Sequence, residues 1–77
     1  MVHPSELSFL IVDDVGSVRE FLRQTLIQMG VSHISEASNG QAAVNQFQTK
    51  HPDVVFLDID LPDTSGHKVL EAIKALN

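Results

Sequence analysis

The segment that most constrains the fold of this chain is residues 51–66, which reads HPDVVFLDIDLPDTSG. Residues 54–57 and Ile59 form an apolar run without polar alternation, broken only by Asp58. Such a run is typical of a strand that is buried on both faces of a parallel sheet. A proline precedes the run, and a proline and a glycine mark a loop after it. Asp58 is therefore expected at the C-terminal end of a central strand, where open α/β sheets place their chemistry.

The rest of the sequence alternates strands with helices. Residues 8–12 (SFLIV) read as a second buried strand, and residues 31–37 alternate weakly, as an edge strand does. Apolar residues recur at helical spacing after each strand and are expected to face the core. These residues are Val18, Phe21, Leu22, Leu26 and Met29, then Ala43, Val44 and Phe47, then Val69, Leu70, Ile73 and Leu76. The β-α-β-α-β-α order predicts one α/β domain with a parallel sheet and right-handed crossovers.

Capping signals indicate where the helices begin and end. Ser17 has capping-box spacing to a glutamate three residues later, so it is predicted to cap the first helix. Gly30 stands where a left-handed C-terminal cap is expected. The turn at residues 38–40 is predicted to cap the second helix, and Ser65 the third. Arg19 is expected on the exposed face of the first helix.

The composition excludes several classes of function. No stretch of ~18 apolar residues exists to span a membrane, and the N-terminus lacks the pattern of a secretory signal. The absence of cysteine excludes disulfides, thiolate metal sites and cysteine nucleophiles, and suits a reducing cytoplasm. The formal net charge of −5 argues against nucleic-acid binding, because no basic stripe is present to contact phosphates. It is compatible with a cation ligand or a basic partner.

Acidic residues gather at the predicted ends of two strands. Asp13 and Asp14 follow the strand at 8–12, and Asp58, Asp60 and Asp63 lie at or just past the end of the strand that follows Asp53. If the two strands are neighbours, these carboxylates meet at one edge, where they repel one another unless a cation neutralises them. Oxygen ligands of this kind suit Mg²⁺. A carboxylate beside that metal could act as a nucleophile towards phosphorus and form an aspartyl phosphate.

With these residues in view, the sequence resembles the receiver domain of bacterial two-component response regulators. The resemblance covers essentially the whole chain, and the combination of motifs is specific. The matching features are the pair Asp13-Asp14, the turn Glu36-Ala37-x-Asn39-Gly40, the segment Pro52-Asp53-Val54-Val55-x-Leu57-Asp58, the pair Leu61-Pro62, and Gly66.

The resemblance implies a role for each acidic residue. Asp58 would accept a phosphoryl group from a histidine kinase, a phosphotransfer protein or a small phosphodonor. Four residues would hold Mg²⁺. Asp14 would bind it directly, Asp13 would bind it through water, Asp58 would add its carboxylate, and Asp60 would contribute its backbone carbonyl as a further protein ligand. The protein would then be a cytoplasmic signalling module and not an enzyme.

The chain also departs from the family pattern. Family members have five βα units in the flavodoxin-like strand order 2-1-3-4-5, whereas three units are present here. Residues 1–77 are therefore interpreted as the N-terminal portion of a receiver domain, with a truncated sheet of order 2-1-3. The family's hydroxyl residue on strand four and lysine on strand five have no counterpart, because Lys68 and Lys74 both fall in the last helix.

This interpretation makes residues 54–57 an edge strand although their composition is that of an interior strand. An exposed apolar edge tends to pair with another chain. The first helix would also lose a neighbour and leave apolar surface uncovered. We therefore expect a homodimer, an exchange of elements, or a partner that completes the sheet at the third strand.

Other interpretations of the same residues stay open. One is a receiver-like interaction module that does not switch, which the missing hydroxyl and lysine favour. The Asp58-x-Asp60 spacing also resembles the nucleophile motif of haloacid-dehalogenase phosphohydrolases, although that motif normally opens a longer chain. Asp58 could simply cap a loop, and the Asp13-Asp14 pair could simply favour a helix N-terminus. Asp63 and the four histidines are expected in loops or on the surface.

Overall fold

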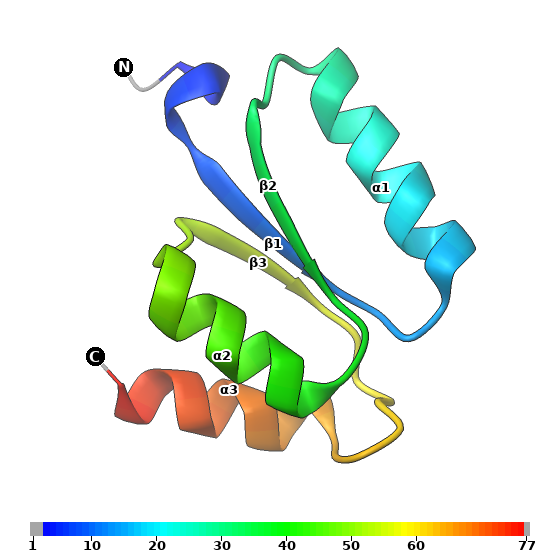
Figure 1. Ribbon diagram of the computed structural model, residues 1–77, viewed down its shortest axis with the longest axis vertical. Coiled ribbons are helices and arrows are strands. Elements are labelled where there is room, and N and C mark those ends of the chain that lie inside the picture. The colour runs from blue at the N-terminus through cyan, green and yellow to red at the C-terminus, as the bar shows by residue number, and fades with distance from the viewer. Residues whose placement is uncertain (1–2, 77) are drawn as a thin grey trace.

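Three parallel strands form the centre of the fold (Figure 1). The computed structural model describes residues 3–76. In it β1 (Ser8–Val12) lies between β2 (His33–Ala37) and β3 (Val54–Leu57), so the sheet order is β2-β1-β3. β1 pairs with both neighbours in parallel, with Leu10 opposite Ser35 on one side and Val55 on the other. The predicted strand order 2-1-3 and the edge position of β2 are confirmed.

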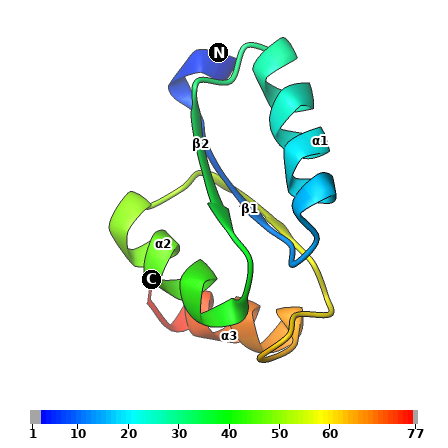
Figure 2. The same ribbon diagram turned by 45° about the vertical axis from the view of Figure 1, so that its right-hand side comes forward.

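Helices cover both faces of the sheet. α1 (Gly16–Gln28) lies on one face, and α2 (Gly40–Lys50) and α3 (Gly66–Ala75) lie together on the other, as the turned view in Figure 2 shows. A short 3-10 helix, Pro4–Glu6, precedes β1. The alternating order of strands and helices agrees with the prediction. None of the helices within residues 3–76 is long and apolar enough to cross a bilayer.

The core is divided by the sheet into two clusters. The larger cluster lies under α2 and α3 and is centred on Leu10 and Val12, which are almost fully buried. The smaller one lies under α1 and is centred on Ile11 and Leu26. Alternate residues of β1 thus point to opposite faces, as they do in any strand. Both faces of β1 are covered, which explains why its sequence is apolar without interruption.

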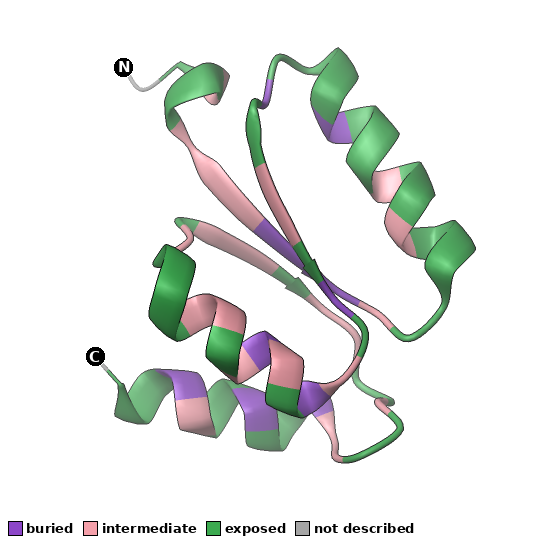
Figure 3. Cartoon of the chain, in the orientation of Figure 1, coloured by how far each residue is buried: buried purple, intermediate pink, exposed green. Residues whose placement is uncertain are grey.

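The apolar stripe predicted for α1 is only partly buried, which corrects the expectation that it faces the core. Leu26 is buried and Leu22 packs against the smaller cluster. Phe21 and Met29, however, are 70% and 63% exposed, and Val18 is also exposed. In Figure 3 most of α1 has the green colour of exposed residues. The helix spacing identified one apolar face correctly, but only a narrow part of that face meets the sheet.

The helix caps agree with the sequence at three of four positions. Gly30 has a positive φ of 95° at the end of α1. Asn39 accepts a hydrogen bond from the backbone of Ala42 at 2.8 Å, and Ser65 caps α3. The prediction for Ser17 is wrong. The helix begins two residues earlier than a Ser17 cap implies, at Gly16, and its N-cap residue Val15 makes no side-chain capping bond.

Candidate functional site

The pairing of β1 with β3 brings the acidic residues to one edge of the sheet. Val12 lies opposite Leu57, and the N–H of Asp58 donates to the carbonyl of Val12 at 2.9 Å. On the other side of β1, the N–H of Asp13 donates to the carbonyl of Ala37 at 3.1 Å. The strand register therefore continues one residue past each strand end and places Asp13 beside Asp58.

Three carboxylates converge at this edge. Asp13, Asp14 and Asp58 each offer an oxygen atom, and these atoms lie within 4.8 Å of one another. Asp13 and Asp58 are half-buried, whereas Asp14 is exposed. The structure thus brings together three of the four residues predicted to form the metal site. We name Asp13, Asp14 and Asp58 the acidic triad.

The loop between β1 and α1 is held by hydrogen bonds to Asp13. The N–H of Val15 donates to Asp13 Oδ1 at 2.9 Å, which fixes the turn that leads into α1. Arg19 Nη1 donates to the backbone carbonyl of Asp13 at 2.7 Å, and Arg19 Nε pairs with Glu36 Oε1 at 3.2 Å. The prediction that Arg19 lies on the exposed face of α1 is therefore wrong. Its side chain is only 23% exposed, and it joins α1 to the loop and to β2.

The loop that follows β3 folds back on itself beside Asp58. The N–H of Gly66 donates to the carbonyl of Ile59 at 2.7 Å, and Asp60 forms an isolated antiparallel bridge with Ser65. The N–H of Asp60 points at Asp58 Oδ1 at 3.4 Å. The carboxylate of Asp60 is outside the acidic triad, and the residue is exposed. Only its backbone is close to the phosphoacceptor candidate.

Asp63 has a role that the sequence pattern did not indicate. The residue is exposed in the loop after β3, as predicted, and its carboxylate also accepts hydrogen bonds from the backbone N–H groups of Gly40 and Gln41. These two bonds hold the pKa of Asp63 below its ordinary value, and the bond from Gly40 has the larger effect. The carboxylate is therefore charged at neutral pH. No local spacing could reveal this contact, because its partners are more than twenty residues away in the sequence.

The acidic triad fits a divalent cation on the chemistry of its donors. All three ligand groups are carboxylates, which are hard oxygen donors of the kind that Mg²⁺ prefers. Mg²⁺ is usually held by one or two carboxylates together with waters and phosphate oxygens, and the exposed Asp14 leaves one side of the triad accessible to water. The four histidines, His3, His33, His51 and His67, are all exposed, as predicted.

The sequence matches the response regulator receiver domain family over residues 9–77, which is most of the chain. The chain belongs to the response regulator receiver family. The fold agrees, since the three-stranded parallel sheet of order β2-β1-β3 with three helices matches solved receivers. Membership associates the chain with two-component signalling, as the sequence motifs predicted.

Chemotaxis proteins are among the receiver's relatives. It is 35% identical over 68 residues to the chemotaxis protein CheY of Bacillus subtilis, which covers 88% of this chain and 57% of that protein. The identity to CheY of Thermotoga maritima is 36% over 67 residues, covering 87% of this chain and 53% of that protein. The receiver thus spans little more than half the length of these relatives.

Solved structures with bound ions are also similar to the receiver. The CheX-CheY-BeF3-Mg²⁺ complex of Borrelia burgdorferi matches with a TM-score of 0.87 and 30% identity, covering 92% of this chain and 55% of that chain. The response regulator TrrA of Thermotoga maritima in complex with Mg²⁺-BeF matches with a TM-score of 0.86 and 35% identity. That match covers 92% of this chain and 61% of the other.

Proposed function

We propose that the chain is a Mg²⁺-dependent phosphoacceptor of two-component signalling, with Asp58 as the residue that receives the phosphoryl group. The observation that carries this proposal is the acidic triad, in which carboxylates from the ends of β1 and β3 lie within 4.8 Å of one another. The family match and the similarity to two receivers solved with Mg²⁺ and beryllium fluoride support it. The assignment of residues 1–77 as the N-terminal portion of a receiver domain, and a cytoplasmic location, belong to the same proposal.

In this proposal the residues of the site have defined roles. A carboxylate oxygen of Asp58 attacks the phosphorus atom, and the bond from phosphorus to the donor breaks. That bond is P–N for the phosphohistidine of a kinase or phosphotransfer protein, and the donor imidazole leaves with the electron pair. Asp13, Asp14 and Asp58, with the backbone carbonyl of Asp60, would hold Mg²⁺. When bound, the cation would neutralise charge on the transferred group.

The arrangement of the site favours a residue that accepts a phosphoryl group over an enzyme that hydrolyses phosphate esters. Asp58 is half-buried at the end of β3 and is kept in place by the bond from its N–H to Val12. The carboxylate of Asp60 lies outside the acidic triad, so it is not gathered with Asp58 as the second aspartate of a phosphohydrolase motif. We therefore propose a signalling acceptor, and the phosphohydrolase interpretation is the weaker one.

Incubation with acetyl phosphate tests the proposal. With Mg²⁺ present, intact-mass spectrometry is expected to detect one phosphoryl adduct per chain, because a small acyl phosphate supplies the same group as a kinase. Chelation of Mg²⁺ with EDTA is expected to abolish the adduct, since the triad then lacks the cation that neutralises its charge. An adduct of equal yield with and without Mg²⁺ would contradict the metal dependence.

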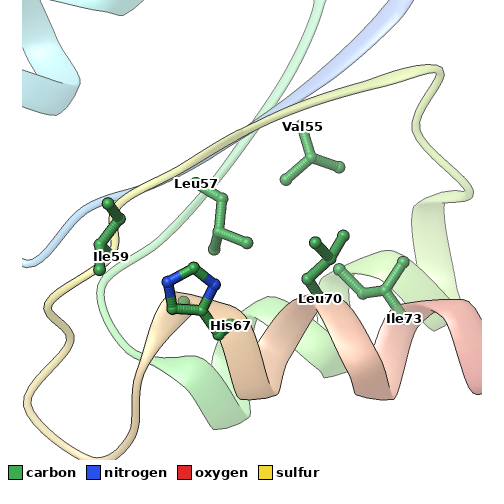
Figure 4. A pocket seen from close by; sticks show the side chains of 7 residues that line it. Val55, Leu57, Ile59, His67, Leu70 and Ile73 are labelled. Carbon is green, nitrogen blue, oxygen red and sulfur yellow. The ribbon is translucent and has the colours of Figure 1, made fainter.

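The open edge of β3 favours a second function, that of an interaction surface. Within residues 3–76, β3 pairs with β1 alone. A groove of about 350 Å³ lies between β3 and α3, and its apolar lining includes Val55, Leu57, Leu70 and Ile73. Figure 4 shows Leu57 and Val55 of β3 directed towards Leu70 and Ile73 of α3. On the opposite face Phe56 is 38% exposed and stacks on Phe9, with ring centroids 6.0 Å apart.

We propose that a second copy of this chain pairs with the β3 edge. Strand addition needs a free backbone edge and apolar neighbours, and an identical chain brings both, because residues 54–57 contain no charged residue to oppose pairing. Two β3 strands related by a twofold axis would run antiparallel and join the two sheets.

Light scattering after size-exclusion chromatography at high micromolar concentration measures this association. The wild-type chain is expected to be a dimer, and Phe56→Lys is expected to be a monomer, because a lysine on an edge strand prevents pairing. Met29→Lys is the matched control, since Met29 is also exposed but lies at the end of α1. A monodisperse wild-type monomer, or equal behaviour of the two variants, would contradict the proposal.

A further inference from the structure

Asp63 connects two segments of the site edge that are far apart in the sequence. Its Oδ1 accepts a hydrogen bond from the N–H of Gly40 at 2.7 Å, and its Oδ2 accepts one from Gln41 at 3.0 Å. Both oxygens of one carboxylate are thus bound to the first turn of α2. The negative charge also lies at the positive end of the helix dipole, which strengthens the contact.

This contact joins the loop after β3 to the start of α2, and it is not merely a local helix cap. α2 already has a local cap, because Asn39 Oδ1 accepts a hydrogen bond from the N–H of Ala42 at 2.8 Å. Asp63 comes from the loop after β3 and bonds to two other N–H groups that the helix leaves free. The two side chains therefore serve the same helix end from different parts of the chain.

Close packing also holds the loop after β3 against the start of α2. A Cβ atom on Gly40 would overlap the methyl group of Thr64 and would lie 3.1 Å from Val69 Cγ2 and 3.2 Å from Asp63 Oδ1. The loop therefore packs directly on the backbone of α2 at Gly40. The two hydrogen bonds and this close packing fix the tip of the loop against the helix.

The other end of the same loop carries the phosphoacceptor. The N–H of Leu61 donates to the carbonyl of Thr64 at 3.2 Å, and the N–H of Gly66 donates to the carbonyl of Ile59 at 2.7 Å. Residues 58–66 thus form a closed loop with Asp58 and Asp60 at its base and Asp63 near its tip. Because the loop is short and internally bonded, we expect a movement at its tip to change the direction of the Asp60 backbone.

We propose that Asp63 is a positioning residue for the cation site, which acts by fastening the loop after Asp58 to the N-terminus of α2. The inference rests on the proposed function, because it concerns the placement of the Asp60 carbonyl relative to the acidic triad. Asp63 touches neither the cation nor the phosphoryl group in this account. It limits the positions that the loop can take, so that the site is formed before Mg²⁺ arrives.

Mg²⁺ affinity separates this role from a purely structural one. Titration followed by the backbone amide NMR signals of the acidic triad gives the affinity of the folded protein in each variant. Asp63→Ala is expected to weaken Mg²⁺ binding by about tenfold, the lower end of the cost of losing a group outside the ligand set that orients a metal site. Asp63→Asn removes the same charge but keeps an oxygen that can accept one hydrogen bond, so its loss is expected to be several-fold smaller.

Asn39→Ala is the matched structural control. It removes a cap from the same helix end but leaves the loop at residues 58–66 untouched, so Mg²⁺ affinity is expected to stay at the wild-type value. Equal Mg²⁺ affinities for Asp63→Ala and Asp63→Asn would overturn the inference but not the proposed function. The same holds if Asn39→Ala loses as much Mg²⁺ affinity as Asp63→Ala. If Asp63→Ala does not fold, a Mg²⁺ affinity of Asp63→Asn equal to that of the wild type overturns it. Failure of the wild-type chain to bind Mg²⁺ at the acidic triad would instead overturn the proposed function and the inference with it.

Discussion

Replacing Asp58 with asparagine is expected to weaken Mg²⁺ binding at least about tenfold while the protein stays folded. Asp58 provides one of the three carboxylates whose oxygens lie within 4.8 Å of one another, so the substitution removes a charged ligand. Loss of a group that merely supports a ligand costs about 10–100-fold in metal affinity, and loss of the ligand itself should cost at least as much. Isothermal titration calorimetry with Mg²⁺ measures the effect.

Without Mg²⁺, the same substitution is expected to leave the stability of the folded protein unchanged or to raise it slightly. The triad places three negative charges close together, so removing one relieves repulsion in the folded state. At a separation of about 4 Å the gain is about 1 kcal/mol per neighbouring charge in bulk water. Urea denaturation in EDTA, followed by circular dichroism, should therefore find Asp58→Asn as stable as the wild type or slightly more stable.

Glu71→Gln is the control for this experiment, because Glu71 is an exposed residue of α3 and the change removes one negative charge of the same kind. Its Mg²⁺ affinity is expected to remain close to that of the wild type. If Asp58→Asn binds Mg²⁺ as tightly as Glu71→Gln, the acidic triad is not the cation site.

Replacing Gly66 with alanine is expected to destabilise the domain by about 1–3 kcal/mol or more, the usual cost of adding a methyl group to a closely packed position. A Cβ atom there would overlap the carbonyl oxygen of Asp58 and would lie 3.0 Å from Ile59 Cα and 3.1 Å from the Asp58 carbonyl carbon. The neighbours are backbone atoms, which cannot rotate away as a side chain can. The start of α3 would therefore move away from the end of β3.

The free energy of unfolding in urea, measured by circular dichroism, reports this effect, since the chain has neither tryptophan nor tyrosine for fluorescence. Gly16→Ala is the matched control. The nearest heavy atom to a Cβ on Gly16 is Arg19 Nη2 at 3.6 Å, an ordinary contact, and the position is in the first turn of α1. That variant is expected to be unchanged or more stable by up to about 1 kcal/mol. Equal effects of the two substitutions would show that the close approach at Gly66 carries no cost.

The strands and the acidic triad were predictable from the sequence because each depends on local or nearly local pattern. An unbroken apolar run identifies β1 and β3, and the residue after each run falls at the C-terminal edge of the sheet. Once β1 and β3 are neighbours, Asp13, Asp14 and Asp58 must come together. The burial of α1 was harder to predict, because periodicity identifies an apolar face but not how much of it meets another element. Phe21, at 70% exposure, is the clearest case.

The contacts that hold the loops of the site could not be predicted in this way. The capping-box spacing after Ser17 suggested a local cap, but Glu20 bonds to Gln24 on the helix surface, and the turn into α1 is fixed by Asp13 instead. The bonds from Arg19 to the Asp13 carbonyl and from Gly40 to Asp63 join separate parts of the chain. Such contacts depend on tertiary packing, which brings together residues that no spacing in the sequence relates.

Locating the phosphoryl group on the chain tests the central claim most directly. After incubation with Mg²⁺ and acetyl phosphate, borohydride reduces an aspartyl phosphate to homoserine and releases phosphate, and tandem mass spectrometry of peptides then identifies the converted residue. The proposed function predicts homoserine at position 58 alone, in the Mg²⁺-containing sample only. Conversion at Asp60, Asp13 or Asp14, or no conversion in a folded protein, would contradict the assignment of Asp58 as the phosphoacceptor.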